Sequence, residues 1–382
     1  MFQLHRRILA WTLPWILLFG TAGIARAEVG ITDSEILIGQ SLGLTGPLAE
    51  LTQDIGNGAR AYVSAINAKG GIHGRRLRLI TMDDGYQVPN TVKNVEQMIE
   101  RDKVFALLNV TGTPNCEAIL PAVQKSQVPF FAPFTGAVST RKPMIENVFN
   151  VRASYRDETE KLVQHLHTIG IQKIAVVYQA SSFGKDGLAG VEAAMAQRGI
   201  KAHGTASIES NASDVAKSVD ALAGGKPEAI IMITAGRPTV EFIKSYRKVS
   251  RGVQFYSLSV MGTNANLKAL GSDGVGVVVA SVVPFPWNQS IALVGDYQAA
   301  MQKIGITEYS FVSLEGYINA RILGEAIERA GRDLTRSGLV KAAEGMTQVG
   351  LGGFNVRFGR ESRQASKHVE LTIIGRNGKF IK

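Results

Sequence analysis

The stretch from Ile36 to Gly71 constrains the fold of this chain more than any other. A short apolar run of strand type, Ile36-Leu37-Ile38, leads into a loop broken by Gly43, Gly46 and Pro47. Apolar residues then recur with the spacing of one helix face; they are Ile55, Ala59, Tyr62, Val63 and Ile66. Gly70-Gly71 ends the helix, because glycine readily adopts the left-handed conformation. A strand, a loop and a helix N-terminus together form the ligand crevice of an open parallel sheet.

The same strand–loop–helix unit recurs along the chain in two successive series. The expected strands cover residues 77–82, 104–108, 128–132 and 148–152, and then 174–178, 201–207, 229–234, 255–259 and 275–283. These runs alternate with helical patterns, which predicts an α/β fold of doubly wound parallel sheets. Residues 284–287 break the rhythm and read as a connector. Helices over 291–301, 314–330 and 337–344 and a terminal hairpin over 369–381 complete the pattern.

The first 27 residues are typical of a signal peptide. A basic start at residues 5–7 precedes an apolar stretch over residues 8–24, and Ala25-Arg26-Ala27 matches a cleavage site. The mature chain is therefore expected to begin at Glu28. The alternative is a membrane anchor, against which the glycines and the small-residue exit argue.

Cysteine and charge limit the compartment and the partners. Cys116 is the single cysteine, so no internal disulfide forms and no cysteine near the cleavage site carries a lipid. An exported, unanchored protein is most useful in a periplasm. Removal of three arginines with the leader lowers the net charge from +10 to +7. The basic residues are scattered without interleaved aromatic residues, so no nucleic acid partner is expected.

Motifs for catalysis, cofactors and metals are missing from the crevice loops. Residues 43–46 form only a G-x-x-G, which is too short for a dinucleotide fingerprint. His165 and His167 are two apart on a helix, so they lie on different faces and make no metal pair. There is no G-x-S-x-G. We therefore expect a binding protein without cofactor or metal rather than an enzyme, and a hydrolase is the least favoured reading.

Several motifs resemble a known family, the solute-binding proteins of branched-chain amino-acid ABC transporters in the type I periplasmic binding fold. They include GLTGPLA, NGARAYVSAINAKGGIHGRRLRLITMDD and KIAVVYQASSFGKDG. The resemblance covers nearly all of residues 28–382. It implies two lobes joined by three hinge segments. Lobe one would comprise residues 28–151 and 284–350, and lobe two residues 152–283 and 351–382.

The resemblance also implies which residues bind the ligand. Lobe one would hold a ligand carboxylate through Thr113 and the Phe134-Thr135-Gly136 loop. Thr hydroxyls and free backbone N–H groups at a helix N-terminus suit that role. From lobe two, Phe183 would close over the ligand, and Arg237 would lie on the next loop. The other readings are that the threonines only form turns, that Phe183 is core and that Arg237 is a surface residue.

The first loop of the chain becomes one wall of the cleft in this interpretation. It is expected to contribute Thr45 or Leu51. A departure from the family lies in residues 258–263, where amino-acid binders place an acid that pairs with the ligand ammonium. This loop has no Asp or Glu. Unless another acid reaches in, a buried ammonium would lack a counter-charge, at a cost of several kcal/mol.

The ligand is therefore expected to be a small carboxylate-bearing molecule, either an amino acid or an aromatic or aliphatic carboxylate, and the missing acid favours a carboxylate without an amine. An aromatic one is favoured, because Phe134, Phe183 and Trp287 are placed to line the cleft. The predicted function is a periplasmic solute-binding protein that delivers its ligand to the membrane permease of an ABC importer. The alternative is a ligand sensor of the same fold that signals to a receptor or regulator.

Overall fold

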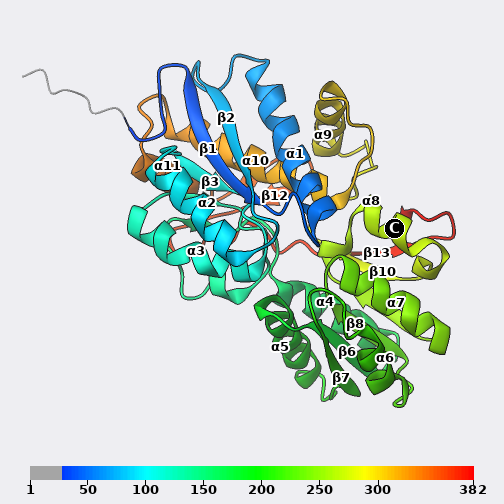
Figure 1. The fold of residues 1–382 in the computed structure, drawn as a ribbon. Coiled ribbons are helices and arrows are strands. Elements are labelled where there is room, and N and C mark those ends of the chain that lie inside the picture. The colour runs from blue at the N-terminus through cyan, green and yellow to red at the C-terminus, as the bar shows by residue number, and fades with distance from the viewer. Residues whose placement is uncertain (1–27) are drawn as a thin grey trace, which may run out of the picture.

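The structure, a computed structural model, describes residues 28–382 and consists of two lobes, each built around a β-sheet (Figure 1). The predicted signal peptide and cleavage site lie outside the described residues. The alternation of strands and helices confirms the predicted α/β fold. None of the described helices is long and apolar enough to cross a membrane.

Lobe one contains a five-stranded parallel sheet in the order β2-β1-β3-β4-β5. In its centre, Ile38 pairs with Leu79 on one side and with Ala106 on the other. The strands are β1 (Glu35–Leu42), β2 (Arg76–Asp83), β3 (Ala106–Leu108), β4 (Phe130–Phe131) and β5 (Val148–Phe149). The helices are α1 (Ala49–Asn67), α2 (Val88–Glu100), α3 (Thr113–Ser126), α9 (Ala292–Lys303), α10 (Phe311–Ala330) and α11 (Arg336–Glu344). The late helices α9 and α10 pack against α1, so the chain returns to this lobe after building the other.

Lobe two contains a seven-stranded sheet in the order β14-β13-β10-β9-β8-β6-β7. The strands are β6 (Ile174–Gln179), β7 (Gly204–Ile208), β8 (Ala229–Ile233), β9 (Gln254–Ser257), β10 (Val278–Ser281), β13 (Glu370–Ile374) and β14 (Phe380–Ile381). The helices are α4 (Tyr155–Thr168), α5 (Ser182–Ala196), α6 (Val215–Ala223), α7 (Arg237–Val249) and α8 (Asn264–Leu270). The terminal hairpin adds antiparallel strands to one edge, so this sheet is mixed rather than purely parallel.

Some short elements differ from the sequence prediction. The strand expected over residues 275–283 is only β10, because Val282 and Val283 already belong to the segment that leaves the lobe. Helix α8 and the two-stranded ribbon of β11 (Val349–Gly350) and β12 (Asn355–Val356) were not anticipated. A seven-residue helix and two-residue strands carry too little periodicity to be read from sequence.

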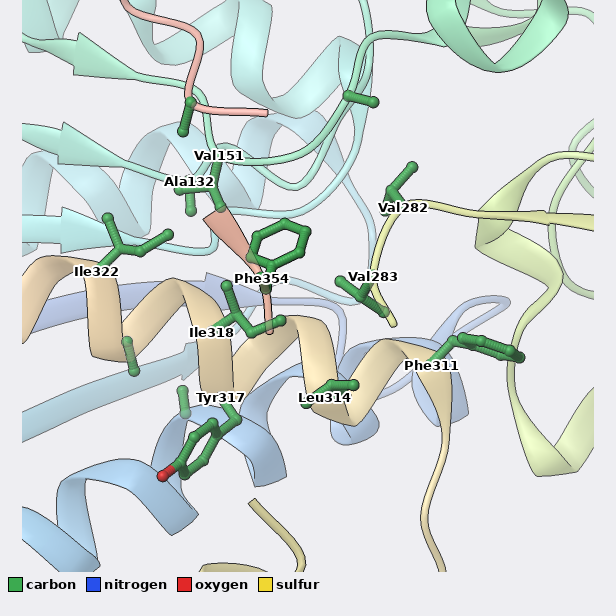
Figure 2. Close-up of a cluster of buried hydrophobic side chains, with 14 of the residues drawn as sticks. Ala132, Val151, Val282, Val283, Phe311, Leu314, Tyr317, Ile318, Ile322 and Phe354 are labelled. Carbon is green, nitrogen blue, oxygen red and sulfur yellow. The ribbon is translucent and has the colours of Figure 1, made fainter. Parts of the chain in front are cut away.

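The chain passes between the two sheets in three places, and all three pack on α10. Figure 2 shows Val151, Val283 and Phe354 around Leu314 and Ile318 of this helix, within one buried apolar cluster. In α10, 15 of 20 residues are buried. A helix buried on most of its circumference belongs to the centre of a domain, not to its surface. The crossing segments therefore share one rigid support. The exact lobe boundaries at residues 151, 283 and 350 stay a prediction.

Helices α1 and α10 approach each other so closely that only glycine fits at the contact. A Cβ added at Gly58 would overlap the carbonyl oxygen of Ser313, and one added at Gly316 would overlap the carbonyl oxygen of Ile55. In each case the obstacle is backbone of the facing helix, which cannot rotate away.

We predict that Gly316→Ala destabilises the fold by about 1–3 kcal/mol through overpacking, despite the higher helix propensity of alanine. The matched control is Gly295→Ala in α9, where the added methyl group meets open space. That variant is expected to gain roughly 0.5–1 kcal/mol. Chemical denaturation measures both, and equal effects at the two positions would contradict the close helix contact.

The cleft between the lobes as candidate functional site

The loops that follow the strands of both sheets meet in one buried apolar cluster between the lobes. Lobe one contributes Leu48, Leu51 and Phe134, and lobe two contributes Phe183 and Leu258. In open α/β sheets, ligands bind outside the carboxyl ends of the strands, which is where these loops lie. The cleft between the lobes is therefore the candidate site.

The two lobes touch at both ends of this cleft. At one end, the backbone N–H of Val138 in lobe one donates to Asp186 Oδ1 in α5, at 3.0 Å. At the other end, Gly236 lies so close to Pro47 that an added Cβ would be 2.9 Å from the Pro47 carbonyl oxygen. The structure thus holds the lobes in a closed arrangement.

Thr113 and Thr135, two of the predicted site residues, are brought together where the lobes meet. Thr113 begins α3 directly after Gly112, and its hydroxyl is 2.7 Å from the Thr135 hydroxyl. Both side chains are buried. The Thr135 hydroxyl also accepts from the Ala137 N–H at 3.1 Å. The turn-forming role and the cleft position are therefore compatible, and ligand contact remains a prediction for both residues.

Aromatic rings line the cleft around these hydroxyls. Phe134 is 3% exposed, and Phe183 packs edge-to-face on Tyr155 with ring centroids 5.1 Å apart. Gly136 lies against Tyr155, whose N–H donates to the Gly136 carbonyl at 2.8 Å. Any side chain at position 136 would collide with the Tyr155 ring. Tyr155, the first residue of α4, was missed by sequence reasoning although it directly contacts two predicted site residues.

The remaining predicted residues lie farther from the buried centre. Leu51 is buried in the cluster between the lobes, whereas Arg237 is exposed at the start of α7. A small surface cavity contacts both of them. Thr45 is exposed, and its hydroxyl donates to Asp83 Oδ2 at 2.7 Å. The structure therefore places Arg237 at the rim and gives Thr45 a partner outside the cleft.

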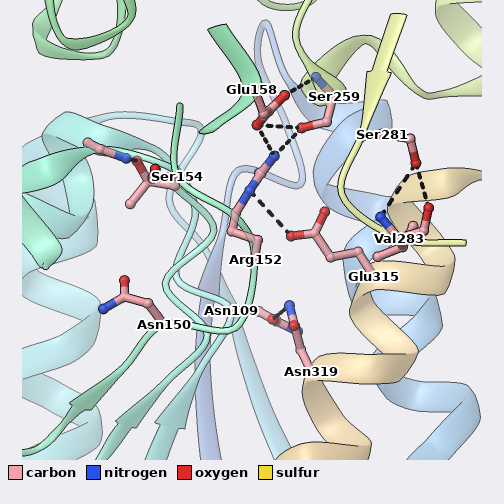
Figure 3. A network of polar contacts seen from close by, with 12 residues as sticks. Asn109, Asn150, Arg152, Ser154, Glu158, Ser259, Ser281, Val283, Glu315 and Asn319 are labelled. Carbon is pink, nitrogen blue, oxygen red and sulfur yellow. Dashed lines mark hydrogen bonds and ion pairs between the residues drawn. The ribbon is translucent and has the colours of Figure 1, made fainter. Parts of the chain in front are cut away.

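A buried ionic network crosses from one lobe to the other beside the aromatic rings (Figure 3). Its centre is Arg152, on the segment between β5 and α4. Nη2 of Arg152 bonds Glu158 Oε1 of α4 at 3.2 Å and also donates to the Ser259 hydroxyl. Its Nε lies 3.6 Å from Glu315 Oε1 of α10. The guanidinium carbon is 4.9 Å from the Phe134 ring centroid, so the charge lies against the cleft wall.

Glu158 is the acid that contacts the loop over residues 258–263, which has no Asp or Glu of its own. Its Oε2 accepts from the Ser259 N–H at 2.7 Å, and its Oε1 accepts from the Ser259 hydroxyl at 3.1 Å. An acid does reach this loop, but from helix α4. Because both of its oxygens are engaged with Ser259 and Arg152, the carboxylate supports the loop and is not free for a ligand.

A second buried guanidinium, Arg141, fixes the predicted carboxylate loop. Its Nη1 donates to the carbonyls of Thr135 at 3.1 Å and Ala137 at 2.8 Å, and its Nη2 donates to the Arg152 carbonyl at 3.1 Å. Within residues 28–382 it has no carboxylate within ion-pair distance. Burial and the charge of Arg152 lower the pKa of Arg141 to about 10, so it stays charged at neutral pH.

Glu315, the second carboxyl partner of Arg152, is also made harder to ionise by its surroundings. Burial raises the pKa of the Glu315 carboxyl to about 7, against the attraction of Arg152 and Arg141 and with the repulsion of Glu158. Near neutral pH this carboxyl is therefore only partly charged. Burial also raises the pKa of the Glu158 carboxyl, against the attraction of Arg152. Two buried guanidiniums thus face two carboxyls that burial makes harder to ionise, and the cleft wall carries a positive excess.

Metal chemistry receives no support from the described residues. In residues 28–382, no cluster of His, Cys, Asp and Glu side chains is arranged to hold a metal ion. Cys116, the one free thiol, is buried, and burial raises its pKa well above the usual range.

Comparisons with known proteins agree with this geometry. The family described as periplasmic binding protein matches residues 35–379. A Leu/Ile/Val-binding protein homolog 7 from Brucella abortus is 24% identical, with 93% of each chain covered. The structure of a possible leucine/isoleucine/valine-binding protein from Rhodopirellula baltica has a TM-score of 0.87 and 32% identity, covering 91% of this chain and 96% of that one. A substrate-binding periplasmic protein from Ralstonia solanacearum has a TM-score of 0.84 and 32% identity, covering 91% and 99%.

The chain thus belongs to the periplasmic binding protein family, in its type I branch of leucine/isoleucine/valine-binding-protein-like members. Members of this family are binding proteins and not enzymes, in agreement with the sequence prediction. The resemblance recognised in the sequence motifs is confirmed.

We predict that Arg152→Gln destabilises the protein by about 3–5 kcal/mol, because two buried carboxylates lose their cation. Arg78→Gln is the control. Arg78 pairs with Glu35 at 3.5 Å on the surface, and such pairs contribute at most about 1 kcal/mol. Urea denaturation of both variants measures the difference. Comparable losses of stability in the two variants would show that the buried network contributes no more than a surface ion pair.

We predict that Glu315→Gln removes a pH-dependent contribution to stability. The native state holds the Glu315 proton up to about pH 7, whereas the ordinary value is 4.5. As pH rises through this window, the unfolded chain releases the proton first, so the native state loses stability. The stability of Glu315→Gln relative to wild type should therefore rise between pH 5 and 8, by on the order of 2 kcal/mol. A constant difference over this range would contradict the assignment.

Proposed function

We propose that this protein is the solute-binding component of an ABC importer in the periplasm, and that it captures a small carboxylate between its two lobes. The observation that carries the proposal is the closed cleft, where the Thr113 and Thr135 hydroxyls lie among the rings of Phe134, Tyr155 and Phe183. The family of the chain and its leader-like N-terminus support a periplasmic location. The protein would then deliver its bound ligand to a membrane permease.

The charge of the cleft wall favours an anionic ligand. Arg152 is buried, and among the described residues its Nη1 has no hydrogen-bond partner. Buried charges without full compensation are costly, and a ligand carboxylate nearby reduces that cost. Each hydrogen bond from the cleft to the carboxylate would contribute about 1.5–3 kcal/mol.

The same wall disfavours an ammonium group on the ligand. Glu158 is engaged by Ser259 and Arg152, and Glu315 is only partly ionised near neutral pH. An α-amino acid would bring a buried cation close to two buried guanidiniums. The apolar and aromatic lining instead suits an aromatic or aliphatic carboxylate without an amine.

The closed arrangement explains how binding would be signalled to a permease. A ligand shifts the balance between open and closed forms only through contacts that it makes better in one of them. Thr135 lies in lobe one and Phe183 in lobe two, so a ligand that touches both is bound fully only when the lobes are closed. The closed form would then be the one that docks.

A thermal-shift screen tests the proposal, because a binding protein must gain stability with its ligand. The screen covers amino acids, aromatic acids, short dicarboxylates and amides. A ligand at 100 times its dissociation constant would add about 2.7 kcal/mol. We expect stabilisation by acids without an amine, and none by the amides.

Thr135→Val provides the site-specific test. Loss of one hydrogen bond to a charged carboxylate should weaken binding at least tenfold. Thr205→Val, at an exposed position in β7, is the control and should bind as wild type does. If the hit compound binds Thr135→Val with unchanged affinity, the carboxylate site lies elsewhere.

A further inference from the structure

A groove of about 1100 Å³ lies apart from the ligand cleft, beside two of the segments that cross between the lobes. Its walls come from the loop after β4 in lobe one, the start of α4 in lobe two and residues 357–367, on the way from β12 to β13. None of the aromatic residues that surround the Thr113–Thr135 pair lines it. The proposed carboxylate site therefore does not account for this groove.

Basic side chains dominate the lining of the groove. Six basic residues line it, namely Arg141, Lys142, Arg156, Arg357, Arg360 and Lys367. Two acids, Asp157 and Glu361, share the lining. Asp157 is already engaged, because its Oδ2 accepts from the N–H and the hydroxyl of Ser154 in the α4 capping box. Much of the positive excess of the chain is thus gathered in one place.

None of these cations has a carboxylate within ion-pair distance in the part of the chain that the structure describes, although Asp186 lies close enough to attract Arg141 and Arg156. No ion pair in residues 28–382 involves any of the six. Arg141 is 5% exposed and its Nε has no hydrogen-bond partner. Scattered surface cations usually find nearby carboxylates, whereas here like charges from three separate segments converge on a concave surface. Such an arrangement attracts and concentrates anions.

We propose that this groove binds a small polyanion with at least two phosphate or carboxylate groups. Four of the six cations are arginines, whose planar guanidinium matches these groups in two parallel hydrogen bonds. The N-terminus of α4 at Ser154 adds a favourable dipole. Because Lys142 belongs to lobe one and Arg156 to lobe two, an anion that contacts both favours the lobe arrangement seen in this structure.

Calorimetric titration of residues 28–382 with tripolyphosphate, and in parallel with citrate, tests the proposal at matched ionic strength. The test variant is Arg156→Gln/Arg357→Gln, and the control is Lys93→Gln/Arg101→Gln, which removes equal charge from α2 and its C-cap. We expect the test variant to bind at least tenfold more weakly than wild type, and the control within twofold. The stronger of the two probes identifies phosphate or carboxylate as the preferred group.

Three outcomes would overturn the proposal. They are no binding of either probe to wild type, equal weakening in both double variants, and groove-dependent binding of anionic lipid vesicles without binding of either soluble probe. No binding of either probe would mean that the cations are simply solvated. Equal weakening in both double variants would mean that only net charge matters, and binding of vesicles alone would mean that the surface is a membrane contact. The ligand cleft is tested separately by aromatic monocarboxylic acids and by Thr135→Val, because Thr135 does not line the groove.

Discussion

The pairing of the Arg152 guanidinium with two carboxylates is the interaction on which the arrangement of the two lobes depends. Arg152 lies on a crossing segment, Glu158 on the first helix of lobe two, and Glu315 on the central helix of lobe one. A charge buried to this extent is tolerated only when it is paired and hydrogen-bonded. Any motion that separates the lobes must therefore rearrange these contacts, and the network links the closed state to the hinge.

Helix α10 gives this network a fixed base. It carries Glu315, and it supports all three crossing segments through a continuous apolar surface. Its close contact with α1 through Gly58 and Gly316 holds it in the body of lobe one. Arg141 completes the connection, because it binds the carbonyls of the Thr135–Ala137 loop and of Arg152. Ligand loop, hinge and lobe two are thus joined through hydrogen bonds to two buried guanidiniums.

The fold could be predicted from the sequence because its signals are local. The apolar strand runs and the helix spacing after Ile36 are read within about ten residues, and so are the terminal strands. Thr113 and Thr135 were proposed from the family resemblance, and the structure brings their hydroxyls to within 2.7 Å of each other, although their role in binding stays a prediction. The loop over residues 258–263 has no acid of its own, and in the structure Glu158 of α4 contacts it.

The ionic network could not be predicted, because its members are far apart in sequence. Arg152 and Glu315 meet only after the chain has built lobe two and returned. Glu158 reads as an ordinary acid in the first turn of a helix, where such residues are common. The sequence held one indication of the network, because Arg152 lies where the alternation of strands and helices is interrupted. For Thr45 and Arg237 the position in a loop was predicted, but the direction of the side chain was not. Thr45 bonds Asp83, and Arg237 lies exposed at the start of α7.

The central claim is that the buried guanidiniums and the occupied carboxylates make this cleft suitable for a carboxylate without an ammonium group. Calorimetric titration of the same protein sample with leucine and with benzoate, at neutral pH, tests it most directly. The account predicts binding of the benzoate-type acid and none of leucine. Tight binding of leucine would contradict it, because the cleft would then have to supply a free carboxylate that Glu158 and Glu315 do not provide in this structure.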